Sequence, residues 1–379
     1  MNAPRNRNPG ERHVNALRGD QVGSLLRPSE LLQARVDYCA GRLDRGGLRA
    51  EEDRAVLTAL RHQQDCGLDI YTDGEFRRVS FMTGFVDAVD GFTEVEAAAL
   101  PWKGGTGTRP STRKAHIVAG RLRQRDRIAD VEEAFLGAHA PGPFKITLPS
   151  PLQFAMYSYL PDLTDQAYAS RAELIADAAR ILAGEATQLA ASGVPYVQVD
   201  APSYTHLADP SLVAANRAMG VDVDELIEAA IEGDNEILDA ARAGGAITAV
   251  HLCRGNSRGR WLAEGGYDPI AEKLFTRLRC RRLLLEYDSP RAGSFAPLLF
   301  VPSNKVVVLG LITTKSGELE SREDLLRRID EASHILPLEQ LALSTQCGFA
   351  SRQDGNPLTH EQQWRKLELV ASLVLEVWP

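Results

Sequence analysis

Short apolar runs alternate with longer segments of helical periodicity along most of the chain. Eight of these runs are strand-like, and most are continuous rather than alternating with polar residues. This pattern is typical of strands that are buried on both faces of a sheet. We predict strands at Gln21–Leu25, Leu68–Thr72, Phe144–Leu148, Tyr196–Val199, Ala246–His251, Arg282–Tyr287, Lys305–Leu311 and Gln340–Ser344.

The segments between the later runs carry apolar residues at helical spacing. Thr164–Ala191 is long and rich in Ala, and it stops at Gly193 before Pro195, as a helix does. Asp222–Arg242 and Ser321–Ser333 follow the same pattern. Helices that alternate with strands indicate parallel strands, and eight such strands predict a closed (β/α)8 TIM barrel. No G-x-G-x-x-G motif follows the first strand, which argues against a dinucleotide-binding sheet.

The domain organisation predicted from these patterns is simple. We expect one barrel domain over residues 14–379, preceded by a polar, disordered tail over residues 1–13. A chain of 379 residues is compatible with a single barrel. The stretch 80–142 has no clear helical pattern, and we interpret it as an insertion near the barrel mouth, with a hairpin around 113–120.

Composition and charge narrow the classes of function. The net charge of −8 and the lack of a concentrated basic face argue against a nucleic-acid-binding protein. No apolar run reaches the length of about 18 residues that a membrane helix needs. The five cysteines are an odd number in a long chain, which favours a reducing, cytoplasmic location. We expect Cys39, Cys66 and Cys280 to pack on or beside helices, and the oligomeric state stays open between monomer and homodimer.

Metal-ligating residue types follow three of the later predicted strands. His251 and Cys253 end one run, Glu286 ends the next, and Cys347 follows the last. In a barrel, functional side chains gather at the carboxyl ends of the strands. Residues two apart in an extended segment point to the same side. Two thiolates, an imidazole and a carboxylate form a set that suits Zn2+, and metal coordination deprotonates a thiol. We therefore predict a zinc site that activates a thiol substrate.

The motifs HLCRGN, LEYDSPRAGSF and LSTQCGFAS occur in this order. They resemble the catalytic half of the cobalamin-independent methionine synthases, and above all their short, single-domain relatives. The resemblance covers about residues 21–378. It implies a (β/α)8 barrel that holds one zinc through His251, Cys253, Glu286 and Cys347 and transfers a methyl group to the thiol of homocysteine.

The same resemblance implies a site for the amino-acid part of the substrate. Two carboxylates of the family hold the amino group of homocysteine, and the matching segments LDIYTDGEFRR and VQVDAPS give Glu75 and Asp200. An ammonium group between two carboxylates forms charge-assisted hydrogen bonds. The motif QVGSLLRP resembles the loop that contacts the substrate carboxylate, which gives Ser24.

The chain departs from the family in the part that binds the methyl donor. Ala201 stands where the family has Glu, and LPSPLQFAMYS offers Phe154 and Tyr157 but no Trp. Lys315 lies near the place of a family His in VVVLGLITTKSGE, and the chain is too short for the extra N-terminal barrel of the full-length synthases. We interpret the donor as a simpler methyl carrier, such as a methylated corrinoid or a small methyl donor.

Two other functions stay open from the sequence. Epoxyalkane:coenzyme M transferases resemble the same barrel and open an epoxide with a zinc-bound thiolate. Their thiol carries a sulfonate, for which Arg77, Arg78 and Arg254 would be cationic partners, whereas Glu75 and Asp200 favour an amino-acid thiol. The other alternative is a zinc ion that only stabilises the fold.

Overall fold

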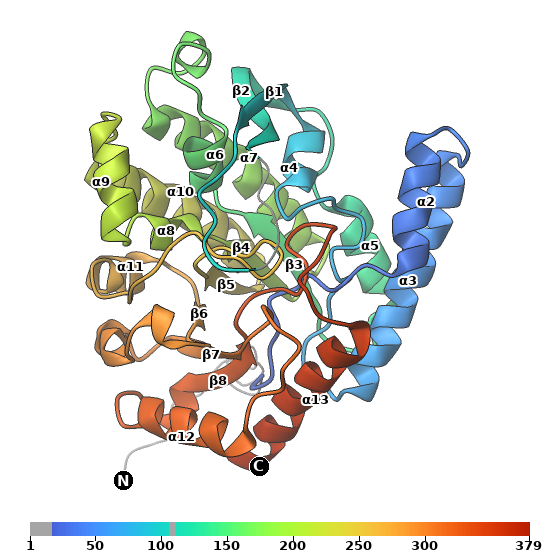
Figure 1. The fold of residues 1–379 in the computed structure, drawn as a ribbon, viewed down its shortest axis with the longest axis vertical. Coiled ribbons are helices and arrows are strands. Elements are labelled where there is room, and N and C mark those ends of the chain that lie inside the picture. Colours follow the sequence, from blue (N-terminus) through green and yellow to red (C-terminus); the bar gives the residue numbers. More distant parts are fainter. Residues whose placement is uncertain (1–16, 106–110) are drawn as a thin grey trace.

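The centre of the molecule is a parallel sheet surrounded by helices (Figure 1). The structure is a computed structural model that describes residues 17–105 and 111–379, so the tail expected over residues 1–13 lies outside the described residues. The sheet has the order β3-β4-β5-β6-β7-β8, as α/β units with one helical connection after another produce. Its strands are β3 (Lys145–Pro149), β4 (Tyr196–Asp200), β5 (Ile247–Leu252), β6 (Arg282–Glu286), β7 (Val306–Ile312) and β8 (Leu341–Thr345).

These six strands confirm six of the eight predicted runs, and each agrees to within one residue at both ends. The predicted strands Gln21–Leu25 and Leu68–Thr72 are wrong. An isolated bridge joins Gly19, just before the first segment, to Leu343 of β8, and another joins Tyr71 of the second segment to Phe144, just before β3.

Side chains join these two segments where a strand ladder was expected. Gln21 Nε2 donates to Ile70 O at 3.1 Å, and Thr72 Oγ1 donates to Gly23 O at 2.8 Å. Within the described residues, the regular sheet is therefore six strands wide and is not a closed eight-stranded ladder.

The helices begin where the sequence offers side-chain caps. Ser170, Asp222 and Ser321 each accept a hydrogen bond from a backbone amide in the first turn of α7, α10 and α12, as N-cap residues do. The Ser170 cap explains why the long predicted helix begins later than Thr164. The helices are α2 (Ser29–Cys39), α3 (Arg45–Asp65), α4 (Thr83–Ala88), α5 (Asp130–His139), α6 (Leu152–Tyr157), α7 (Arg171–Ala191), α8 (Ser203–His206), α9 (Pro210–Ala218), α10 (Val223–Ala243), α11 (Ala271–Arg277), α12 (Arg322–Ser333) and α13 (His360–Val377).

The insertion over residues 80–142 contains a hairpin and two helices that were not expected. The stretch 113–120, where the hairpin was predicted, forms only part of its second strand. Strands β1 (Val89–Ala98) and β2 (Thr112–Gln124) pair in antiparallel fashion, and α4 and α5 flank them. The hairpin lies at the top of the molecule in Figure 1, whereas α2 and α3 form an arm at its right side. The chain after β1 returns to the sheet side, where Lys103 and Trp261 form an antiparallel bridge.

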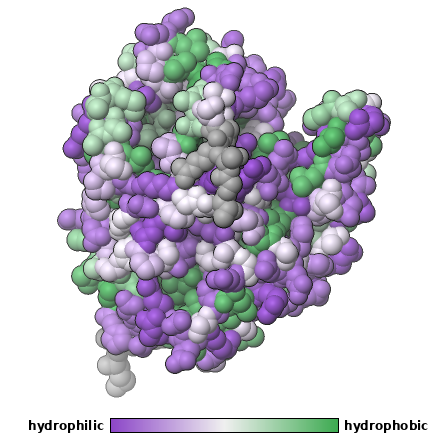
Figure 2. All heavy atoms as spheres, viewed as in Figure 1, coloured by the Kyte–Doolittle hydropathy of each residue, from purple (hydrophilic) through white to green (hydrophobic). Residues whose placement is uncertain are grey.

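Apolar side chains fill the space on both sides of the sheet. The larger cluster packs the helices against the strands. A smaller cluster joins Val22 and Ile70 to Tyr196, Leu284 and Val308, so the two N-terminal segments share one core with the inner faces of the strands. Hydrophilic residues cover much of the face shown in Figure 2. No helix among the described residues is long and apolar enough to cross a membrane.

A glycine is required where β7 passes β6. A Cβ atom on Gly310 would lie 2.8 Å from Leu285 O and 3.0 Å from the Cα of Gln346, which is closer than ordinary contacts allow. Gly310 pairs with Glu286, and the register of β7 against β8 shifts directly after it. The narrow gap places the end of β6 next to the loop that follows β8.

Candidate active site

A cavity of about 570 Å3 lies at the carboxyl ends of the strands. Its wall includes Cys253 directly after β5, Asp200 at the end of β4 and Cys347 shortly after β8. The insertion supplies another part of the wall through Leu100, Trp102 and Arg113. The carboxyl ends of parallel strands are the usual place for a binding site in α/β folds.

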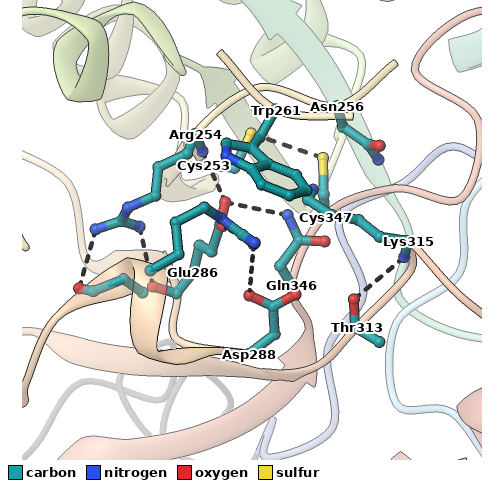
Figure 3. A network of polar contacts seen from close by, with 12 residues as sticks. Cys253, Arg254, Asn256, Trp261, Glu286, Asp288, Thr313, Lys315, Gln346 and Cys347 are labelled. Atoms are coloured by element: carbon teal, nitrogen blue, oxygen red, sulfur yellow. Dashed lines mark hydrogen bonds and ion pairs between the residues drawn. The ribbon is translucent and has the colours of Figure 1, made fainter. Parts of the chain in front are cut away.

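Three of the four predicted metal ligands come together in this cavity. The ligand atoms of His251, Cys253 and Cys347 all lie within 4.8 Å of one another, and all three residues are buried. The two sulfur atoms are 3.7 Å apart (Figure 3). This separation is too long for a disulfide, but two sulfurs bound to zinc at about 2.3 Å with a tetrahedral angle would lie roughly 3.8 Å apart.

The imidazole of His251 also fits a metal site. The ring is 3% exposed, and within the described part of the chain neither of its nitrogens has a hydrogen-bond partner. A buried polar group without a partner is costly. A metal ion between His251 and the two cysteines would satisfy one nitrogen, so the donor set fits Zn2+.

Loop contacts hold the two cysteines in place. Asn256 Nδ2 donates to Gly348 O at 2.8 Å, which ties the loop after β5 to the loop after β8. Thr205 Oγ1 donates to Cys253 O at 2.6 Å. These bonds fix the backbone on both sides of the cluster, so its geometry does not depend on the side chains alone.

Glu286, the fourth predicted ligand, lies outside this cluster. Its Oε2 accepts hydrogen bonds from Arg254 N at 2.7 Å and Gln346 Nε2 at 3.1 Å (Figure 3), and its Oε1 accepts one from Arg291 at 2.8 Å. Burial alone would raise the pKa of Glu286, but the positive charges of Lys315, Arg254 and Arg291 outweigh it and lower the pKa to about 2. The structure thus shows an ionised carboxylate that is engaged by an arginine.

The two carboxylates predicted to hold an amino group line the same cavity. Burial raises the pKa of Glu75 to about 7, although Arg78 opposes the shift, and the charge of Asp200 adds to it. Burial likewise raises the pKa of Asp200 to about 6, against the opposing effect of His251. Glu75 Oε2 has no hydrogen-bond partner among the described residues. Two nearby, under-neutralised carboxylates form a site that favours a cation.

The turn that carries Glu75 is held in an uncommon conformation. Glu75 has a φ of 55°, a region that residues other than Gly rarely adopt. Asp73 Oδ1 accepts a hydrogen bond from Glu75 N at 2.9 Å, and Arg27 donates to Glu75 O at 2.7 Å. The surrounding bonds offset this strain and direct the side chain toward the cavity wall.

Ser24 is the third residue predicted to contact the substrate. It lines the cavity, and its backbone oxygen accepts a hydrogen bond from Phe349 N at 2.8 Å. Its Oγ lies so close to Gly348 that a Cβ atom there would be 1.9 Å away. Ser24 is therefore packed directly against the residue that follows Cys347.

The three arginines considered for a sulfonate do not line the cavity in the described part of the chain. Arg77 pairs with Asp53 at 2.5 Å and Arg78 with Glu132 at 3.1 Å. Arg254 donates to backbone oxygens, including Gly265 O at 2.9 Å. Their guanidinium groups are thus engaged in holding the fold.

The structure adds His206, which the sequence motifs did not reveal, and pairs it with Tyr157. His206 and Tyr157 both line the cavity, and the Tyr157 hydroxyl is hydrogen-bonded to His206 Nδ1. Burial lowers the pKa of His206 to about 4, so the ring is neutral near pH 7. The only sequence signal was a His shortly after the motif VQVDAPS. Phe154, by contrast, is fully buried against Phe85 and does not contribute to the wall.

Comparisons with known proteins identify the class of protein. A family model described as the catalytic domain of cobalamin-independent synthase matches residues 19–256. The chain belongs to this family, which confirms the resemblance seen in the sequence motifs. The match includes Glu75, Asp200, His251 and Cys253 but ends before Glu286 and Cys347.

Individual relatives cover nearly the whole chain. An uncharacterised protein of Bacillus subtilis (strain 168), YxjH, is 36% identical over 95% of this chain and 94% of its own length. Methionine synthase of Sulfurisphaera tokodaii is 25% identical, covering 86% of this chain and 84% of its own length. The crystal structure of a putative vitamin-B12 independent methionine synthase from Listeria monocytogenes superposes with a TM-score of 0.69 and 29% identity, covering 95% and 98% of the two chains. The chain is thus a methionine synthase-like catalytic domain.

Proposed function

We propose that this protein is a zinc-dependent methyltransferase that methylates the thiol of homocysteine and forms methionine. The observation that carries this proposal is a buried His–Cys–Cys cluster in one cavity with two buried carboxylates. The cluster suits a metal-bound sulfur and the carboxylates suit an ammonium group, and homocysteine carries both groups. The family membership supports a methyltransferase.

His251, Cys253 and Cys347 would hold the metal ion. Zinc bound there would supply the positive charge that keeps the substrate thiol deprotonated at neutral pH. Three protein ligands leave a fourth position open, as catalytic zinc sites do. Glu286 is the fourth ligand implied by the family resemblance. We propose that it would take this position once released by Arg291 and would yield it to the substrate sulfur.

Glu75 and Asp200 would bind the substrate ammonium and so fix the thiol in the cavity. Ser24 would contact the substrate carboxylate from the loop that packs on Gly348. Orientation of this kind makes attack on the methyl donor effectively unimolecular. We also propose that the Val22 and Ile70 segments, although they form no regular strands, close the barrel between β8 and β3, which their shared inner core supports.

The alternative is an epoxyalkane:coenzyme M transferase. Exposed cations at the rim of the cavity favour it, because Lys114, Arg258 and Arg352 have side chains that are 80%, 66% and 58% exposed. A sulfonate could bind there. The buried carboxylates Glu75 and Asp200 argue for the amino-acid thiol, because they would repel a sulfonate at the inner end of the same cavity.

Calorimetric titration of the zinc-loaded protein distinguishes the two functions. Homocysteine and coenzyme M are titrated separately, each in two buffers of different ionisation enthalpy, and the difference counts released protons. A thiol that enters the metal site should release about one proton. Proton release with homocysteine alone supports methionine formation, whereas release with coenzyme M alone refutes it and favours the epoxide-opening reaction.

Two variants separate catalysis from a structural metal. Cys347→Ala should abolish proton release, whereas Cys280→Ser, which changes a buried cysteine outside the cavity, should retain it. If Cys347→Ala also lost most of its thermal stability, the metal would be a structural element and the catalytic proposal would fail.

A further inference from the structure

A column of buried polar side chains runs beneath the candidate substrate site. Tyr196, Gln198 and Asp200 alternate along β4 and so point to the same side of the strand. Beside them, Lys145 Nζ donates to Asp20 Oδ1 at 2.6 Å, and the Tyr196 hydroxyl donates to Asp20 Oδ2 at 3.0 Å. All five side chains are at most 5% exposed. The column therefore connects the inner core directly with the cavity wall.

Gln198 is the link between this column and Asp200. Its Oε1 accepts a hydrogen bond from Lys145 Nζ at 2.8 Å. Its Nε2 donates to Asp200 Oδ1 at 2.7 Å and to Val22 O at 2.8 Å. An ammonium group has no acceptor, so Lys145 requires the oxygen of the amide on its own side. The orientation of the amide is thereby fixed, and its nitrogen must face Asp200.

This arrangement restrains one of the two Asp200 oxygens. Both hydrogens of the Gln198 amide are used, one by Asp200 and one by Val22, so the amide cannot turn away without losing two bonds. Asp200 belongs to the cavity wall. A buried acid whose rotamer is fixed by a neighbour is preorganised for a ligand. Such a neighbour raises the affinity, because the acid loses less conformational freedom when the ligand binds.

We propose that Gln198, held by Lys145, is a positioning residue that directs Asp200 to the ammonium group of the thiol substrate. The selectivity for an amino thiol over the same thiol without an amino group then depends on Gln198. This inference rests on the proposed function, because it assumes that a thiol with an ammonium group occupies the cavity. Gln198 itself acts through Asp200 and not on the reacting atoms.

The test compares homocysteine with 4-mercaptobutyrate, which lacks only the amino group. Calorimetry gives the Kd of each thiol for the zinc-loaded protein and for its Gln198→Leu variant. Loss of a hydrogen bond to a charged group should weaken homocysteine binding about tenfold or more, while the Kd of 4-mercaptobutyrate stays unchanged. Equal losses for both thiols, or no loss for homocysteine, would overturn the proposal.

Two further variants separate positioning from a general effect on folding. Gln363→Leu removes an equally buried glutamine that accepts a bond from Leu26 N instead, and it should leave the ratio of the two Kd values unchanged. In an Asp200→Asn background, adding Gln198→Leu should cause no further loss of homocysteine affinity, and a further loss contradicts the assigned route. If Gln198→Leu does not fold, Gln198→Met gives the same comparison.

Failure of the underlying function has a different signature. If neither thiol binds the unsubstituted protein with proton release, the proposed function fails, and the assignment of Gln198 falls with it. If both thiols bind with proton release but the Gln198 variants keep the normal ratio of Kd values, the function stands and only the positioning role is refuted.

Discussion

Replacing Gly348 by Ala should disturb the candidate metal site through Ser24. The added Cβ atom would lie 1.9 Å from Ser24 Oγ, 3.1 Å from Ser24 Cβ and 3.2 Å from Ser24 N. Rotation of the serine hydroxyl removes only the first of these contacts. The other two are still shorter than the separation of roughly 3.5–4.0 Å at which nonpolar contacts are most favourable, so the backbone on one side must move.

The size of the effect follows from this packing. Ser24 is 3% exposed and is tied through its backbone oxygen to Phe349 N, so neither loop can yield freely. Overpacking of this kind costs roughly 1–3 kcal/mol in unfolding free energy. Because Gly348 directly follows Cys347, we also expect weaker zinc binding. Urea unfolding measures the first effect, and competition with a chromogenic chelator measures the second.

A compensating substitution makes the reasoning testable. Ser24→Gly removes both side-chain contacts, so the Ser24→Gly/Gly348→Ala double variant should regain much of the zinc affinity lost in Gly348→Ala. In a double-mutant cycle, the two changes should couple by about 1 kcal/mol or more. Additive effects of the two substitutions, or wild-type stability of Gly348→Ala, would show that the contact with Ser24 does not restrain this loop.

Three other predictions concern buried charge and the thiols. Burial raises the pKa of Asp234 to about 7 from an ordinary value of 3.8. Between these two pH values the folded protein keeps a proton that the unfolded chain releases. The unfolding free energy therefore falls as pH rises through this window. Asp234→Asn should remove this fall, which urea unfolding on both sides of the window would show, and an unchanged pH dependence would contradict it. Arg27 donates to four backbone oxygens, at Leu25, Glu75, Arg78 and Ala350. Arg27→Met should therefore lower the unfolding free energy by roughly 3 kcal/mol or more. A loss below about 1 kcal/mol would mean that water replaces the guanidinium. In a colorimetric thiol assay of the zinc-loaded protein, the exposed Cys39 should react first, and a chelator should release two further thiols, Cys253 and Cys347; unchanged reactivity after metal removal would argue against a thiolate site.

The strands that the sequence predicts well are those whose pairing uses only the backbone. In β5 and β7, continuous apolar residues correspond to burial on both faces, and the prediction is confirmed. The segments at Gln21 and Leu68 are buried as well, but they contain more polar residues, and side chains such as Thr72 Oγ1 take the bonds that a ladder would use. Local apolarity reports burial and does not specify which group supplies each hydrogen bond.

The residues of the candidate site also differ in how far the sequence predicts them. His251 and Cys253 could be found because their spacing and place at a strand end are local properties of the sequence. The engagement of Glu286 by Arg291 and by the amide of Arg254 depends on how two loops fold over the strand end, which the spacing alone does not reveal. Gln198 had a usable signal, since it lies two residues before Asp200 and so shares its side of the strand.

The wall of the cavity comes from two sources with different constraints. The thiol side is built from strand ends, where Gly310 and the loop bonds leave little freedom. Another part of the wall comes from the insertion, through residues such as Leu100, Trp102 and Arg113, which lie outside the parallel sheet. Mutations and length changes in the insertion can therefore accumulate without disturbing the sheet. On the function proposed above, changes in the insertion would alter which alkyl donor the protein accepts and would leave the residues that bind the thiol unchanged.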